Sequence, residues 1–533
     1  MQQNILKMLA VIVGTFLFNL IFWHEKQGIN VLIFDLFIGI ILVKLNAQAF
    51  KTRSVQIVAT GTFIAALLII LHNSLIVKVI HFLSFSILIG LVQETELRFL
   101  GSAFLVYLSN WFTTPKYLIN AFKELPILRG RGEVTKRLNS ALLSILIVPI
   151  FFLIYYVANP KFAALSSTAF THIWNWFSFD IDIYHLLFFI LGLFIVGAAI
   201  LQQNTTHKFV LEDNLSDNLI QENELNSELN TNSNNELNSE LNDAETFIKS
   251  HAADLQNRYK NALNLIITLN FLLLINNVLD IQNVWFGNNT LLSPTELKQF
   301  VHEGTYVLIM GIALAISVTL VLFRGILNFA KNAEILRGSA YLWLAQNAVL
   351  AVSVGMRNWR YIDAYGLAYK RIGVFIFLLL VFFGLSFIYL KIKEKRTLFF
   401  FITRSSWAIY GVLLVACFIN WDIFITKYNL TTTTKSNTID ARFLLQDVSE
   451  KNLKTLLEYR SELLKKMLNQ PYSENDASDY NQPLFQNESA KTDFIDRKIQ
   501  QKRVNFEFEQ KQISWLSWNY ADAQNKAYLN SFK

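Results

Sequence analysis

Long apolar runs separated by short polar stretches make up most of this chain. A helix needs about 20 mostly apolar residues to cross a bilayer, with roughly 17 as the lower limit. The runs that meet this criterion are 5–23, 29–45, 55–71, 74–92, 139–157, 183–202, 261–279, 304–323, 336–355, 372–390 and 398–420. The pattern predicts an all-α fold class, a polytopic transmembrane helix bundle of about 11 spans with a small helical C-terminal domain outside the membrane.

The segment 97–112 is too short for a full span and carries Arg98 near its start. If it crossed the membrane, Lys44, Lys51 and Arg53 would face outside, against the positive-inside rule. If it is interfacial or re-entrant, most lysines and arginines of the loops fall on the inside. We therefore expect a cytoplasmic N-terminus and an extracytoplasmic C-terminus.

Changes in composition predict four regions. Residues 1–203 form an N-terminal membrane bundle and 249–422 form a C-terminal one. Between them, 204–248 is rich in Asn and Glu, and the octapeptide NELNSELN occurs at both 223–230 and 235–242. So polar a tract cannot bury enough apolar surface to offset the entropy of ordering it, which predicts a disordered cytoplasmic insert, with a transient helix as the alternative.

The fourth region, 423–533, has the pattern of an extracytoplasmic helical domain. Ser449 is a candidate N-cap, and the leucines after it recur at spacings of three and four. A second helix is expected over about 489–513. Trp515 and Trp518 lie three residues apart and favour helix packing or membrane-interface anchoring over a binding platform.

Composition excludes several other functions. Hydrophobic residues make up 53% of the chain and charged residues only 16%. The net charge of +7 arises mostly from helix ends, so we predict no nucleic-acid partner. Soluble-enzyme motifs are missing, and a single cysteine, Cys417, excludes a thiolate metal site. We therefore expect no metal and no cofactor.

Few ionisable residues fall inside the apolar runs. Asp35, Lys78 and His81 sit at similar depth in two of them and form a candidate intramembrane polar pair or triad. Pairing would spare each an unpaired charge in a low dielectric. A packing salt bridge and a proton relay are both open interpretations.

A second candidate site lies where the later runs meet the predicted outer face. Four cations, Arg357, Arg360, Lys370 and Arg371, stand on the side that should be poor in them. Partner acids (Glu303, Asp363 and Asp422), an anionic ligand held by bidentate guanidinium groups, or simple contact with outer headgroups could each account for them. The candidate ligand-binding residues are His302, Glu303, Arg357, Asn358, Arg360, Tyr361, Tyr365, Arg371, Asp422 and Asn429.

The run MRNWRYIDAYGLAYKRIGV at 356–374 resembles the hallmark of the bacterial domain-of-unknown-function 4173 family. VHEG at 301–304, LIVPIFFLIYYVANPKF at 146–162 and INWDIFITKYNL with IDARFL downstream extend the resemblance over most of the chain apart from 212–245. Ala368 stands where that family usually has Thr. The resemblance implies a multi-pass protein of the bacterial cytoplasmic (inner) membrane, and implies no activity.

Three functions stay open. The first, which we favour, is an envelope binding or assembly protein with an outer-face site for an anionic lipid headgroup or an envelope protein. The second is a transporter of a small or lipid-linked anionic solute, which should show an internal cavity at mid-membrane. The third is a membrane-embedded transferase acting on a lipid-linked substrate, which should show a lateral groove beside Arg357 and Glu303. An enzyme is the less favoured interpretation, and oligomeric state is not predicted.

Overall fold

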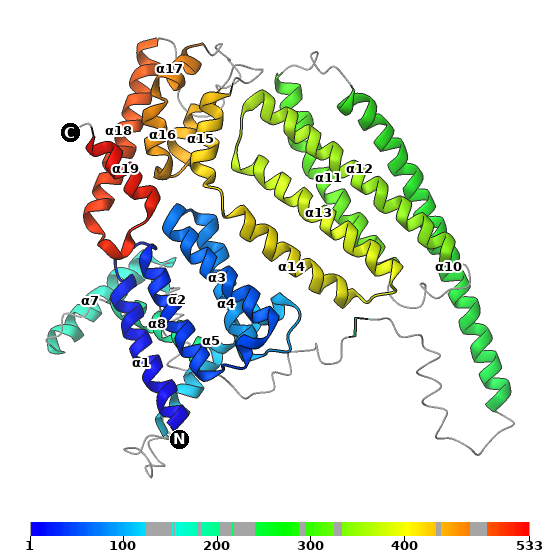
Figure 1. The fold of residues 1–533 in the computed structure, drawn as a ribbon, viewed down its shortest axis with the longest axis horizontal. Coiled ribbons are helices and arrows are strands. Elements are labelled where there is room, and N and C mark those ends of the chain that lie inside the picture. Colours follow the sequence, from blue (N-terminus) through cyan, green and yellow to red (C-terminus); the bar gives the residue numbers. More distant parts are fainter. Residues whose placement is uncertain are drawn as a thin grey trace. The chain divides into compact units, whose positions relative to one another are not determined.

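The computed structural model describes residues 2–123, 152, 155–156, 158–177, 183–201, 216–217, 240–286, 294–323, 333–432, 439–469 and 488–531. Helices and short turns make up these residues, and no strand occurs among them. The chain divides into two compact units, 1–210 with 507–530 and 211–506 with 531–533. The predicted all-α fold class is confirmed for the described part of the chain (Figure 1).

The first unit is a bundle of helices that run antiparallel to their sequence neighbours. Its tightest pairs are α3 with α4, α1 with α8 and α4 with α5. Gly90 of α4 lies so close to α5 that an added Cβ would overlap the carbonyl of Ala103. The helices are α1 (Gln2–Phe22), α2 (Ile29–Leu45), α3 (Arg53–His72), α4 (Leu75–Gln93), α5 (Leu100–Lys123), α7 (Pro160–Phe177) and α8 (Ile183–Ile200).

The first unit also contains the C-terminal segment 507–530. This segment includes the end of α18 (Glu488–Gln512), the short turn η10 (Trp515–Ser517) and α19 (Tyr520–Asn530). It packs on α2 and α3, at the end of the unit where the α1–α2 and α3–α4 turns meet. The predicted topology places those two turns and the C-terminus on one side of the membrane, which this contact supports. Which compartment that side faces stays a prediction.

The core of the second unit lies among five neighbouring helices (Figure 1). Apolar residues from all but α14 fill it, including Ile266, Ile312, Leu336, Val354 and Ile388. The helices are α10 (Glu240–Asp280), α11 (Pro294–Leu322), α12 (Ala333–Tyr365), α13 (Tyr369–Lys393) and α14 (Leu398–Ala416). They pack in the order α10–α12, α11–α12, α12–α13 and α13–α14.

Buried polar side chains join α10 to α12 at regular steps. Asn270 donates to the carbonyl of Ser339 (3.0 Å) and accepts from the Gln346 amide (2.7 Å). One heptad further along both helices, Asn277 donates to the carbonyl of Gln346 (3.0 Å). Near the end of α10, Asp280 pairs with Arg357. We call this series the α10–α12 ladder.

Shorter helices complete the second unit. They are α15 (Trp421–Thr431), α16 (Leu453–Glu458), α17 (Arg460–Leu468) and the first part of α18. The Ser449 hydroxyl accepts from the backbone N–H of Lys451 and begins the helical turn before α16, which confirms its prediction as an N-cap. The helix expected over 489–513 is also confirmed, as α18.

Seven helices of the described part are long and apolar enough to cross a membrane: Arg53–His72, Leu75–Gln93, Ile183–Ile200, Gln256–Trp285, Ala333–Tyr365, Tyr369–Lys393 and Leu398–Ala416. Leu6–Phe22 and Val307–Leu322 are shorter apolar helices. Several apolar helices thus identify a membrane protein, while the count of about 11 spans is not confirmed. Most of the predicted span 139–157 lies outside the described residues.

Two segments differ from their predicted form. From Leu100 on, the stretch 97–112 belongs to the longer helix α5, whose contacts with α4 and α8 place it within the first unit. An interfacial position for it stays a prediction. Helix α10 begins at Glu240, inside the insert predicted to be disordered, and continues from there into an apolar helix. The rest of the insert lies outside the described residues, apart from 216–217, whose carbonyls accept from Thr397.

Candidate functional site

The residues predicted as a ligand site surround the turn between α12 and α13. Helix α12 ends at Tyr365, and Gly366 follows with a left-handed φ of +81° that favours glycine. Asn429 of α15 holds the next residue on both sides: its side-chain oxygen accepts from the N–H of Leu367 (2.6 Å), and its amide donates to the carbonyl of Leu367 (2.8 Å). Asn429 thus fixes the turn rather than facing an open space.

Arg371 turns back onto the end of α12. Its guanidinium donates to the carbonyls of Tyr365 (3.0 Å) and Gly366, and it lies 4.4 Å from the ring centre of Tyr361. Asn358 donates to the carbonyl of Arg371 (2.9 Å). The last carbonyls of a helix lack intrahelical partners and carry partial negative charge, so the cation satisfies them. Arg371 has an internal role that the sequence pattern did not predict.

Arg357 points into the bundle and pairs with Asp280 of α10. Both side chains are more than nine-tenths buried. The acids predicted as neutralising partners were Glu303, Asp363 and Asp422, so Asp280 was missed. One signal was present: Asp280 directly follows the apolar run 261–279, where an acid is costly unless it is paired.

Asp422 opens α15 and links three parts of the second unit. Its carboxylate accepts from the hydroxyl of Tyr369 on α13 (2.5 Å) and from the hydroxyl of Ser449. The Asn452 amide, next to this pair, donates to the hydroxyl of Thr426 (2.9 Å). Asp422 is buried and doubly hydrogen-bonded, so it fastens the C-terminal helices to the end of the bundle.

Lys502 of α18 is buried near Asp422. Its ammonium donates to the carbonyl of Val448 (2.7 Å). Burial lowers the pKa of Lys502 to about 8, against the opposing effect of the carboxylates of Glu450, Asp422 and Asp447. It is a structural cation that sequence inspection did not single out.

Arg360 differs from its neighbours because it lines an apolar groove between α12 and α13. The groove has a volume of about 540 Å³. Val352, Trp359 and Leu379 are exposed, so the groove opens on the surface of the bundle. Among the described residues, Arg360 is the one charged side chain of a lining that comprises Ala351, Val352, Gly355, Met356, Trp359, Arg360, Phe375, Leu378, Leu379 and Phe382.

His302 and Glu303 belong to α11, and their side chains lie outside what the structure describes. The structure brings Asn358, Tyr361, Tyr365, Arg371 and Asn429 together at the α12–α13 turn, mostly as mutual supports. Asp422 binds Tyr369 and Ser449, whereas Arg357 pairs with Asp280 and Arg360 lines the groove. A ligand role for the set stays a prediction. No cluster of metal-ligating side chains occurs among the described residues.

The second candidate, inside the first unit, joins α2 to α4. The imidazole of His81 lies 2.6 Å from the carboxylate of Asp35, and both side chains are about nine-tenths buried. Lys78 lies one turn from His81 on α4. The contact fits the packing salt bridge, and the proton-relay interpretation stays a prediction.

The helices and the groove define a multispanning membrane protein. The chain belongs to a family described as Domain of unknown function (DUF4153), whose model matches residues 36–459. This corrects the resemblance to the 4173 family, although an uncharacterised family over most of the chain was expected. No curated protein and no solved structure matches the chain.

Proposed function

We propose that this protein is a bacterial inner-membrane protein that binds an anionic phospholipid in the groove between α12 and α13. The single observation that carries this proposal is an apolar groove, open on the bundle surface, with one guanidinium in its lining. The groove accepts an acyl chain, and Arg360 binds the phosphate. Its volume falls within the range of small-molecule sites.

The position of Arg360 favours a lipid over a soluble anion. Trp359 precedes it and is exposed, and tryptophan concentrates at the level of the lipid headgroups. A guanidinium at that level offers two parallel donors to a phosphate. The lipid would therefore contact α12 and α13 along its chain and Arg360 at its head.

The residues that line the groove favour a binding protein over a transferase. A transferase needs an acid, base or nucleophile beside the bound substrate. Among the described residues, the groove lining includes no carboxylate and no histidine, and Arg357 points away toward Asp280, whereas the side chains of His302 and Glu303 lie outside the description. We therefore retain binding, with an envelope assembly role, as the proposed function.

Photo-crosslinking in lipid nanodiscs tests the proposal. Phosphatidylglycerol and phosphatidylcholine, each with the same photoactivatable acyl chain, are compared for labelling of α12 and α13 peptides. Wild type should prefer phosphatidylglycerol severalfold, because both lipids carry the phosphate that Arg360 would bind but the choline cation of phosphatidylcholine repels the guanidinium. Arg360→Ala should remove the preference, and Arg360→Lys should restore only part of it.

Two controls make this experiment decisive. Lys370→Ala removes an exposed cation near the same turn but outside the groove, and should keep the preference. Val352→Trp fills the groove and should reduce labelling by both lipids, whereas Leu342→Trp, on an exposed position of α12 outside the groove, should not. An undiminished preference in Arg360→Ala would reject the site.

A further inference from the structure

The C-terminal segment 507–530 has an inverted distribution of polar and aromatic side chains. Ser517 and Asn525 are only 1% exposed, whereas Trp515, Trp518 and Tyr520 are 67%, 44% and 49% exposed. In a protein surrounded by water, small polar residues are mostly exposed and large aromatic residues are mostly covered. The outward face of this segment is therefore suited to surroundings less polar than water.

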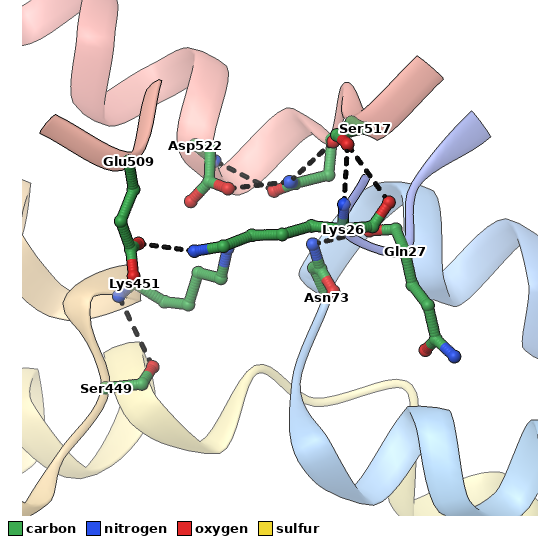
Figure 2. Close-up of polar contacts among 9 residues, drawn as sticks. Lys26, Gln27, Asn73, Ser449, Lys451, Glu509, Ser517 and Asp522 are labelled. Atoms are coloured by element: carbon green, nitrogen blue, oxygen red, sulfur yellow. Dashed lines mark hydrogen bonds and ion pairs between the residues drawn. The ribbon is translucent and has the colours of Figure 1, made fainter. Parts of the chain in front are cut away.

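Hydrogen bonds fix this segment to the turn between α1 and α2 (Figure 2). The Ser517 hydroxyl accepts from the N–H of Lys26 (2.8 Å) and donates to the carboxylate of Glu25. The same carboxylate accepts from the N–H of Ser514 (3.1 Å). The ammonium of Lys26 pairs with Glu509. Glu509, Ser514 and Ser517 thus bind the turn, whereas Lys511 and Lys526 are exposed.

The turn also sets the level at which the aromatic side chains lie. Helix α2 begins at Ile29, shortly after the residues that hold Ser517, and apart from the buried Asn30 its first two turns up to Phe34 are apolar. Contacts with α2 and α3 keep η10 and α19 at that end of the two helices. Segment 507–530 therefore lies where apolar helices give way to polar turns, which is the headgroup level of a bilayer.

We propose that Trp515, Trp518 and Tyr520 insert into the headgroup region of the bilayer and anchor segment 507–530 to the membrane surface. Indole and phenol rings combine an apolar body with a polar tip, and they favour this region over both water and hydrocarbon. The anchor would hold the α1–α2 and α3–α4 turns at one depth. This site lies in the first unit and is independent of the groove.

Site-directed fluorescence tests the proposal in the full-length protein. Cys417→Ala removes the one native thiol, and single cysteines at Trp515, Trp518 and Lys526 carry an environment-sensitive dye in phosphatidylcholine nanodiscs. Lys526 is the matched control, because it is exposed on α19 and charged. Quenching is measured with iodide in water, with headgroup nitroxides and with nitroxides at the acyl-chain end.

Dye at Trp515 and Trp518 should be quenched mainly by headgroup nitroxides, and dye at Lys526 mainly by iodide. Iodide quenching at all three positions would show an aqueous surface and overturn the proposal. Resistance to every quencher at the tryptophan positions would show a covering protein surface, this chain or a second copy, and would equally overturn it. Each introduced cysteine replaces an exposed side chain, whereas Cys417 is buried, so the folding of Cys417→Ala and of each single-cysteine variant is checked by gel filtration.

Discussion

Both units contain a buried ion pair between helices, Asp35–His81 in the first and Asp280–Arg357 in the second, but the contacts around these pairs differ. In the first unit, backbones approach closely through small residues, as at Gly90 beside Ala103, and through short hydroxyl contacts such as Thr62 with Ser84 (2.8 Å). In the second unit, the α10–α12 ladder places amides and one ion pair at repeated steps. Both means suit lipid, where apolar surface alone gives helices little reason to associate.

The two kinds of contact should respond differently to substitution. Close packing depends on shape, so an added atom lowers the free energy of unfolding. A ladder depends on matched donors and acceptors, so the loss of a partner lowers the free energy of unfolding more than added volume does. Since the ladder repeats by heptads along two parallel helices, a shift by one residue would leave its polar groups unpaired.

The largest expected effect comes from breaking the end of the ladder. Asp280→Ala leaves the Arg357 guanidinium buried without its carboxylate, which should lower the free energy of unfolding by about 3–5 kcal/mol. Steric-trap unfolding in bicelles measures this. The double variant Asp280→Leu with Arg357→Met should recover most of the loss, and failure to recover would mean that Arg357 serves another role.

A matched variant in the first unit sharpens the contrast. Asp35→Ala removes the partner of His81, but an imidazole ring has at most two N–H donors against the five of a guanidinium, so fewer donors lose a partner and the cost should be smaller than for Asp280→Ala. Equal losses for Asp35→Ala and Asp280→Ala would remove the distinction between the two units.

The next effect tests close packing. Gly90→Ala should lower the free energy of unfolding by about 1–3 kcal/mol, because its Cβ meets the rigid backbone of Ala103. Gly39→Ala is the control, since nothing lies near its added Cβ, and it should be neutral. Both are measured by the same unfolding assay. A neutral Gly90→Ala would show that α4 and α5 can separate at no cost.

The burial of Lys502 should make the free energy of unfolding change with pH by an amount comparable to the effect of Gly90→Ala. Its pKa is about 8 when folded and 10.5 as the unperturbed value, so the unfolded chain binds more protons between these limits. Stability should therefore rise with pH from about 8 to 10.5, by on the order of 1–3 kcal/mol. The quantity measured is the difference in thermal unfolding between wild type and Lys502→Met across this range.

The exposed Lys465 provides the control for that titration. Lys465→Met should follow the wild-type pH profile, because removing a solvated charge leaves the burial of Lys502 unchanged. A wild-type profile that matches Lys502→Met would show that Lys502 is solvated.

The smallest effect is expected from shortening the insert. Deletion of 219–239 keeps Ser216 and Asp217, whose carbonyls bind Thr397. Halving a flexible loop changes its closure free energy by only about 0.6 kcal/mol. Unfolding and phosphatidylglycerol labelling of the deletion variant should match wild type. A large loss of either would assign a packing or docking role to the tract.

Apolar runs predicted helices well because each span needs only length and hydrophobicity. The candidate site was predicted less well, since a cation at a helix end has several internal uses. Arg357, Arg360 and Arg371 read alike in the sequence, yet one binds a carboxylate on α10, one lines a groove and one satisfies helix carbonyls. Only the packing of α10, α12 and α13 separates these three uses.

Because segment 507–530 is synthesised last and binds the α1–α2 turn, the order of synthesis affects that turn. The ribosome releases the first bundle long before it makes Ser514 and Ser517, so Glu25 and the N–H of Lys26 lack these partners throughout the synthesis of the second unit. A premature stop after Phe506 would therefore harm the earliest part of the protein. Cellular quality control would then recognise the truncated protein by the unpartnered polar groups of its α1–α2 turn.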